Sequence, residues 1–120
     1  MTSESGFGWR LAAGYAVVEV SGEVDLCTQA RFAKVLDRAV GSGAGLVVVD
    51  LRGVRFFAAA GLACLEDVGA VMRARGGALH LVCAIPGPVW RVLSVLGLQQ
   101  RWPVHQQLAE AVRAITSPTA

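Results

Sequence analysis

The stretch LVVVDLRGVRFFAAAGLACLEDVGAVM, residues 46–72, decides the fold of this chain. Its first six residues, 46–51, are apolar except for Asp50, which is typical of a strand that is covered on both faces. Arg52-Gly53 interrupts this run, and a short linker then leads into a turn of small residues at 58–61. The stretch therefore opens with a buried central strand that ends in a tight turn.

The residues after the turn follow a different period. Apolar or small residues recur there at steps of three and four, which marks one buried stripe of a helix: Leu62, Leu65, Gly69 and Met72. The N-terminus of this helix is presented at the carboxyl end of the preceding strand. In open α/β sheets, binding sites usually lie at that end of the strands.

The residues before this stretch predict a hairpin and one helix. Residues 7–11 and 15–20 form two short strand-like runs, and Ala13-Gly14 between them supplies a turn. The second run ends in a polar segment whose Asp25 is a good N-cap residue. A helix is predicted over 26–40, because apolar residues recur there at helical spacing.

The residues after the stretch continue the alternation of strands and helices. A further apolar strand is predicted over 79–85, followed by a helix that Pro86-Gly87-Pro88 opens and Gly97 caps. The buried stripe of this helix is expected at Val89, Val92, Leu93 and Leu96. A short edge strand at 102–105 and a last helix at 106–115 complete the chain. We therefore predict an α/β fold with a four- to five-stranded mixed β-sheet and about four α-helices packed on it.

The bulk composition fits one globular domain. The chain has 120 residues, of which 54% are hydrophobic, and its mean hydropathy is +0.52, so it can build one core. The net charge is only +2 and the basic residues form no run, so we expect no nucleic-acid partner. No apolar run is long enough to span a membrane and the first residues are no signal peptide, so we expect a cytoplasmic protein.

The reactive side chains do not assemble into a recognisable catalytic or metal site. Three cysteines are an odd number and contain no C-x-x-C pair, so core packing is the favoured interpretation: Cys27, Cys64 and Cys83. His80 and His105 lack a spaced metal partner. The adjacent carboxylates of Glu66-Asp67 point about 100° apart on a helix. We expect no enzyme, no metal and no cofactor.

The stretch at residues 46–72 resembles the signature of STAS domains, and among them the bacterial anti-sigma factor antagonists. The residues that match this signature are Asp50, Leu51, Val54, Phe56, Gly61 and Leu62. A Gly-Glu-Val-Asp segment with a threonine three residues later, at Asp25 and Thr28, is similar to a second motif of the family. The resemblance extends from about residue 15 to residue 115. Together with the small, polar residues at the start of the chain, it predicts residues 1–6 as a flexible N-terminus, 7–115 as the STAS domain and 116–120 as a tail.

The resemblance also implies a mechanism of partner switching. In the family, an unphosphorylated antagonist binds an anti-sigma factor that is also a serine kinase of the GHKL type, and so frees a sigma factor. The kinase phosphorylates a serine, and that position is Ala59 in this chain. Its neighbours, which in the family are an aspartate and a second serine, are Ala58 and Ala60. The fold signature is therefore present without the phosphoacceptor.

The partner contacts implied by the resemblance lie on the motifs and on the outer face of the helix after the turn. We expect them at Glu23, Asp25, Thr28, Phe57, Ala58, Ala59, Ala60, Gly61, Ala63, Glu66 and Ala70. Thr28 could instead make a local hydrogen bond at a helix start. We expect a monomer or weak homodimer, with no membrane partner. The alternatives are a non-phosphorylatable scaffold subunit of another signalling or transport complex, a redox sensor that uses Cys27 with Cys64 or Cys83, and a ligand-binding domain.

Overall fold

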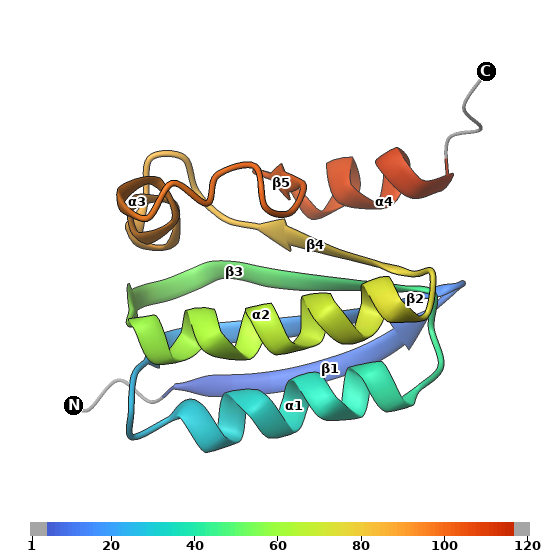
Figure 1. Cartoon of the computed structure of the whole chain (residues 1–120), viewed down its shortest axis with the longest axis horizontal. Helices are drawn as coiled ribbons and strands as arrows, with labels where there is room; N and C mark the ends of the chain where they lie inside the picture. Colours follow the sequence, from blue (N-terminus) through green and yellow to red (C-terminus); the bar gives the residue numbers. More distant parts are fainter. Residues whose placement is uncertain (1–4, 117–120) are drawn as a thin grey trace.

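The chain folds into one sheet with helices on both faces (Figure 1). The computed structural model describes residues 5–116, with side chains up to residue 114. The strands are β1 Gly6–Ala12, β2 Tyr15–Val24, β3 Leu46–Phe57, β4 Ala78–Val82 and β5 Val104–His105. The helices are α1 Gln29–Gly41, α2 Ala59–Ala74, α3 Pro88–Val95 and α4 Leu108–Thr116. The proposed flexible terminus and tail fall mostly on residues 1–4 and 117–120, outside the described residues.

The strand order confirms the predicted mixed sheet. The order is β1-β2-β3-β4-β5, so the valine-rich strand β3 is central. β1 pairs with β2 in antiparallel fashion, and the other three pairs are parallel. β1 and β5 form the two edges. The carboxyl ends of β2 and β3 therefore meet at the same end of the sheet, on the left in Figure 1.

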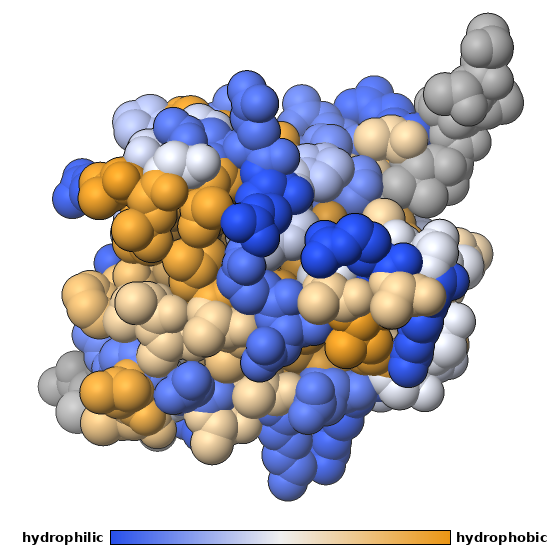
Figure 2. All heavy atoms as spheres, in the orientation of Figure 1, coloured by the Kyte–Doolittle hydropathy of each residue, from blue (hydrophilic) through white to orange (hydrophobic). Residues whose placement is uncertain are grey.

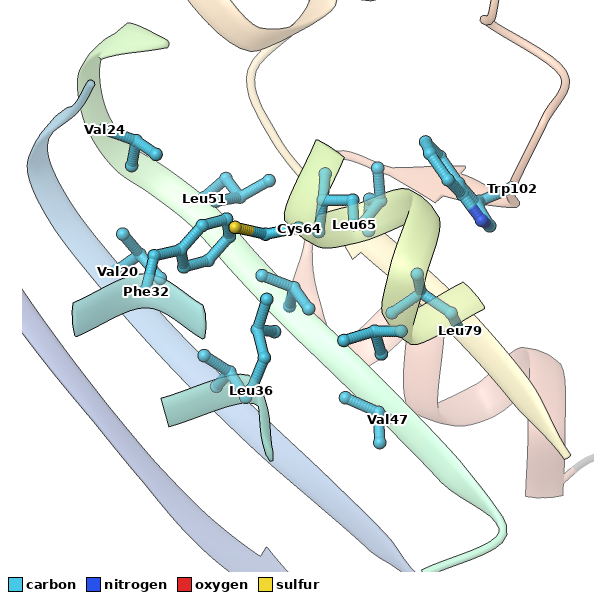
Figure 3. Packing of buried hydrophobic residues seen from close by; sticks show 14 of the residues in the cluster. Val20, Val24, Phe32, Leu36, Val47, Leu51, Cys64, Leu65, Leu79 and Trp102 are labelled. Atoms are coloured by element: carbon cyan, nitrogen blue, oxygen red, sulfur yellow. The ribbon is translucent and has the colours of Figure 1, made fainter. Parts of the chain in front are cut away.

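Successive residues of β3 serve two different cores, because side chains alternate between the faces of a sheet. Val47, Val49 and Leu51 belong to the larger cluster, which the helices α1, α2 and α3 cover. Figure 3 shows this cluster, with Phe32 of α1 and Leu65 of α2 directed toward the strands. The alternate residues of β3 belong to a smaller cluster on the other face with Ala111 of α4: Leu46 and Val48.

The predicted break in the central strand is wrong. β3 continues through Arg52-Gly53, and β2 continues beside it to Val24 instead of ending near residue 20. Ser21 lies opposite Gly53, and a β-carbon added to Gly53 would lie only 3.0 Å from the β-carbon of Ser21. The glycine therefore permits a close approach of the two strands rather than ending one of them.

The helix starts also differ from the prediction. α1 begins at Gln29, three residues later than expected, because Asp25 bonds to backbone N–H groups in the loop before the helix. α2 begins at Ala59, directly after β3, so the expected turn at 58–61 is mostly the first turn of the helix. At the end of α3, Leu96 is exposed rather than buried.

An ion pair within β3, between buried Asp50 and exposed Arg52, is connected to the start of α4. Asp50 is buried, and its carboxylate accepts two hydrogen bonds from the Arg52 guanidinium, from Nε at 3.0 Å and from Nη2 at 2.7 Å. The third nitrogen, Nη1, donates to Gln107 at 3.2 Å. The hydrogen bond to Asp50 is the main reason that the pKa of Arg52 is raised. The polar residue within the apolar strand therefore has a structural role.

Candidate functional site

The candidate site lies where β2 and β3 end and where α1 and α2 begin. A backbone hydrogen bond of 2.8 Å, from the N–H of Ala58 to the carbonyl oxygen of Val24, joins the two strand ends. The loop from Asp25 to Thr28 and the first turn of α2 are therefore held beside each other. Both segments carry residues that the sequence predicts as partner contacts.

The loop before α1 is closed by its own polar side chains. One Asp25 carboxylate oxygen accepts from the N–H groups of Cys27 at 2.9 Å and Thr28 at 3.1 Å. The Thr28 hydroxyl donates to the carbonyl oxygen of Glu23 at 2.9 Å and accepts from the N–H of Asp25 at 3.0 Å. The Thr28 side chain thus makes the local hydrogen bonds of a helix-start residue. These bonds favour a structural role for Thr28 over a role as a partner contact. The Glu23 side chain is exposed.

The first turn of α2 presents small apolar side chains and open backbone donors. Ala58 occupies the N-cap position in an extended conformation, and no side chain caps this helix. Ala59 is exposed and Ala60 is half-buried. A helix start leaves N–H groups without an intrahelical acceptor. Because these three residues carry no hydroxyl group, this turn has no side chain that could accept a phosphoryl group.

Two residues of the predicted contact set are buried instead. The Phe57 side chain is 3% exposed and packs edge-on against Phe32, with ring centroids 6.4 Å apart. Its assignment as a partner contact is therefore wrong, because it belongs to the core. Gly61 is also buried, and a β-carbon there would lie 2.6 Å from Val24 Cγ1 and 2.7 Å from the Phe57 ring. The glycine of the motif is needed for packing.

The outer face of α2 is accessible, as the periodicity predicts. Ala63 and Ala70 are exposed, and small side chains leave the backbone approachable there. Glu66 lies between them and is half-buried. Its Oε2 accepts a hydrogen bond of 2.8 Å from Arg101, which lies beyond α3 in the chain. Glu66 is therefore already engaged in an ion pair that links α2 to the segment after α3.

Several large apolar side chains that the sequence pattern does not single out are exposed at the end of the sheet where this turn lies. The large apolar side chains that are exposed at this end are Leu26 at 82%, Phe56 at 52%, Val95 at 78% and Leu96 at 51%. Figure 2 shows apolar side chains over α3 and smaller ones over the start of α2, on the left of the molecule. We call Leu26, Phe56, Ala59, Val95 and Leu96 the apolar end surface. The Phe56-Phe57 pair was one signal in the sequence, since an aromatic pair cannot point wholly into one core.

The other reactive side chains have structural surroundings. The two histidines are hydrogen-bonded across β4 and β5, with 3.0 Å between His80 Nδ1 and His105 Nε2. Burial, and then the neighbouring His105, lower the pKa of His80. Within residues 5–116, no group of three histidine, cysteine or carboxylate side chains is arranged to hold a metal ion. No helix in this part of the chain is long and apolar enough to cross a membrane.

The cysteines differ in reactivity. Cys64 and Cys83 are buried, whereas Cys27 is exposed in the loop before α1. Burial raises the pKa of Cys64 and raises that of Cys83 to about 11. Because the thiolate is the reactive form, we expect the folded protein at pH 8 to react with a chromogenic disulfide reagent at Cys27 alone. All three thiols should react in denaturant, and rapid reaction of the folded Cys27→Ser variant would contradict this expectation.

Comparisons with known proteins assign the fold and the family. The family model described as "Mlab, STAS domain" matches residues 8–115. The crystal structure of an anti-sigma factor antagonist from Mycobacterium paratuberculosis is 25% identical with a TM-score of 0.84, over 93% of this chain and 94% of that chain. No curated protein matches the sequence of this chain.

Two structures of the SpoIIAA protein share the fold at lower identity. The unphosphorylated form is 17% identical with a TM-score of 0.70, over 94% of this chain and 100% of that chain. The phosphorylated form, from Bacillus, is 18% identical with a TM-score of 0.67, over 92% of this chain and 99% of that chain. At this identity the likeness extends to the fold alone.

Proposed function

This chain belongs to the STAS domain family, and from that membership we propose that it is a partner-binding regulator of the anti-sigma factor antagonist type. In this proposal it binds an anti-sigma factor of the serine-kinase class and so releases a sigma factor. The similarity to an antagonist from Mycobacterium paratuberculosis over nearly the full length of both chains supports this role. The apolar end surface is the proposed docking surface.

The observation that carries the proposal is the uncharged first turn of α2 beside exposed large apolar groups. Phe56 immediately precedes this turn, and its ring is half exposed. Ala59 starts α2, and its small side chain lets a partner approach the open N–H groups. Exposed apolar groups of this size, grouped at one end of a domain, are typical of a protein contact.

The proposed regulator differs from a phosphorylation switch in one respect. A phosphate adds about two negative charges, which at an apolar interface would oppose binding. The alanines at 58–60 offer no acceptor for it. We therefore propose that the complex of this chain with its partner is constitutive and does not respond to ATP.

The same alanines favour a second candidate function. Phosphorylation at this turn cannot dissociate the complex of this chain with its partner. Such a chain could serve as a permanent scaffold subunit of another signalling or transport complex. The docking surface would be the same, but the partner would be no kinase. The two candidates therefore differ in the identity of the partner and not in the chemistry of the surface.

The test combines binding with an acceptor restored at one position. Purified anti-sigma kinases from the same source would be titrated with the native chain and with Ala59→Ser, with and without ATP. We expect both proteins to bind, and only Ala59→Ser to gain a phosphate and dissociate when ATP is present. Ala109→Ser, at an exposed position in the first turn of α4, is the matched control.

The readouts are titration calorimetry for affinity and mass spectrometry for the added phosphate. If no anti-sigma kinase binds the native chain, the antagonist function is contradicted and the scaffold function gains support. If the kinase phosphorylates the native chain and ATP dissolves the complex, the proposed constitutive mode is wrong.

A further inference from the structure

A groove separates the edge strand β1 from helix α1, away from the apolar end surface. Its volume is about 400 Å³. Figure 1 shows α1 lying in front of β1 along the same edge of the sheet. The side chains that line the groove are aromatic on the strand and, apart from Val35, basic on the helix: Phe7, Trp9, Arg31, Lys34, Val35 and Arg38. The groove thus combines an apolar floor with a positively charged wall.

The strand side of the groove has a free backbone edge. β1 is the first strand in the sheet order and pairs only with β2, so every second residue directs its N–H and C=O groups away from the sheet. Natural edge strands are usually blocked by charge or proline. β1 has no proline. Its one charged residue, Arg10, is already in an ion pair, with 3.5 Å between its Nε and Oε1 of Glu19 in β2. Trp9 and Leu11 are exposed along the strand, at 36% and 59%.

The helix side of the groove carries three cations on one face. Arg31, Lys34 and Arg38 are spaced by three and four residues, so they project from α1 in the same direction. Arg31 is held in place, with its guanidinium carbon 4.9 Å from the centre of the Phe7 ring and Nη2 3.2 Å from the carbonyl oxygen of Ser5. A fixed cation can meet an anion without first losing its conformational freedom.

Among residues 5–114, the charge in the groove has no acidic counterpart. None of the residues that line it is acidic. The nearest acidic residue along α1, Asp37, lines a different hollow with Cys64. Among the described residues, Lys34 and Arg38 make no ion pair. A ligand with negative charges would therefore find complementary charges that are not yet used.

The same charges argue against pairing of β1 with a second copy of this chain. Two copies joined edge to edge in antiparallel fashion would place their α1 helices side by side on one face of the extended sheet. The three cations of each helix would then face like charges, which opposes association. An acidic strand placed at the same edge would instead face three cations. The geometry therefore distinguishes between the two occupants.

We propose that the β1 edge binds an extended, acidic peptide segment of a partner protein, which adds to the sheet as a sixth strand. Its main chain pairs with the free N–H and C=O groups of β1. On its face toward α1, carboxylates reach Arg31, Lys34 and Arg38, and the methylene groups of the same acidic side chains cover Trp9, which lies on that face. This site is separate from the proposed docking surface, so it could act while that surface is occupied.

The test uses a defined peptide on the full chain. A fluorescein-labelled peptide of about nine residues, in which glutamate alternates with valine, is long enough to pair along the whole of β1. The control peptide carries lysine in place of glutamate. Anisotropy would give the affinity, and amide hydrogen exchange by NMR would report protection of the outward N–H groups of β1. We expect binding of the acidic peptide alone, new protection in β1, and weaker binding at higher salt.

Charge reversal locates the site. Lys34→Glu with Arg38→Glu should lower the affinity for the peptide by at least about tenfold, because attraction becomes repulsion. The matched control is Arg73→Glu with Arg91→Glu, which makes the same change in net charge on exposed positions of α2 and α3. This control should retain binding within about threefold, because charges beyond a Debye length are screened.

Five results would overturn the proposal. These are absence of peptide binding, equal loss of affinity in both double variants, and binding without new amide protection in β1. The fourth is tight binding of a single-stranded oligonucleotide, but not of the peptide, which would assign the groove to nucleic acid. A dimer seen by light scattering and abolished by Trp9→Glu would assign the edge to a second copy and also overturn it.

Discussion

The substitution Ala59→Asp should abolish most of the affinity of this chain for its partner while leaving the fold intact. Ala59 is exposed at the start of α2, inside the proposed docking surface. An unpaired charge that becomes buried in an interface typically costs several kcal/mol. A loss of about 2.7 kcal/mol already corresponds to a hundredfold weaker complex. The expected effect is therefore at least about a hundredfold, measured by titration calorimetry.

The stability of the free protein should move slightly the other way. The first turn of α2 contains no acidic residue and no side chain caps it, so a carboxylate there gains from the helix dipole by about 0.3–1 kcal/mol. Ala109→Asp is the matched control, since it adds the same charge to the first turn of α4, which packs on the other face of the sheet. A folded Ala59→Asp protein that binds as tightly as the native chain would exclude this turn from the interface.

Periodicity predicted the core correctly because it reports burial directly. The valine run at 46–51 is the central strand, and the stripe at 62–72 faces the sheet. The breaks that the sequence indicates within β2 and β3 are not strand ends in the fold. Ser21-Gly22 and Gly53-Val54 lie opposite each other, so two irregular segments pair and both strands continue. This pairing is a long-range property that local sequence does not contain.

The motif positions were predictable, whereas their surroundings were not. Residues 58–61 lie at the carboxyl end of the sheet because a helix follows a parallel strand there. The packing of α3 on β3 depends instead on how the chain crosses over after β4. For that reason the exposed Val95 and Leu96 were missed, and Leu96 was assigned to a buried stripe. The Asp25–Thr28 loop shows the same limit, because its hydrogen bonds delay the helix start.

The two adjacent phenylalanines offer the sharpest test of the site, because one should control stability and the other binding. Leu51, Val54 and Phe57 all face the larger core, at steps of three residues. In a regular strand, side chains on one face recur at every second residue. β3 departs from this because it has one extra residue relative to β2 at each of two β-bulges, between residues 50 and 53 and between residues 54 and 56. These irregularities leave Phe57 inward and Phe56 outward. The sequence pattern alone placed Phe57 among the expected partner contacts, which is the reverse of this arrangement.

Phe57→Ala should destabilise the fold by about 3–5 kcal/mol, because it removes a buried ring and leaves a cavity beside Phe32 and Gly61. Small domains are stable by about 5–15 kcal/mol, so this is a large share of the total. Urea unfolding followed by circular dichroism would measure it. Phe56→Ala, at a side chain that is 52% exposed, should change stability by less than about 0.5 kcal/mol.

Binding should separate the same two variants in the opposite sense. Removal of an exposed aromatic contact at the centre of an interface typically costs about 2 kcal/mol or more, so Phe56→Ala should weaken the complex by at least about tenfold. Phe57→Ala, in the fraction that remains folded, should bind nearly as well as the native chain, because its ring does not reach the surface. Equal destabilisation by both variants would contradict the register of β3 at this end. Unchanged binding by a folded Phe56→Ala protein would instead remove Phe56 from the docking surface, while leaving the fold as described.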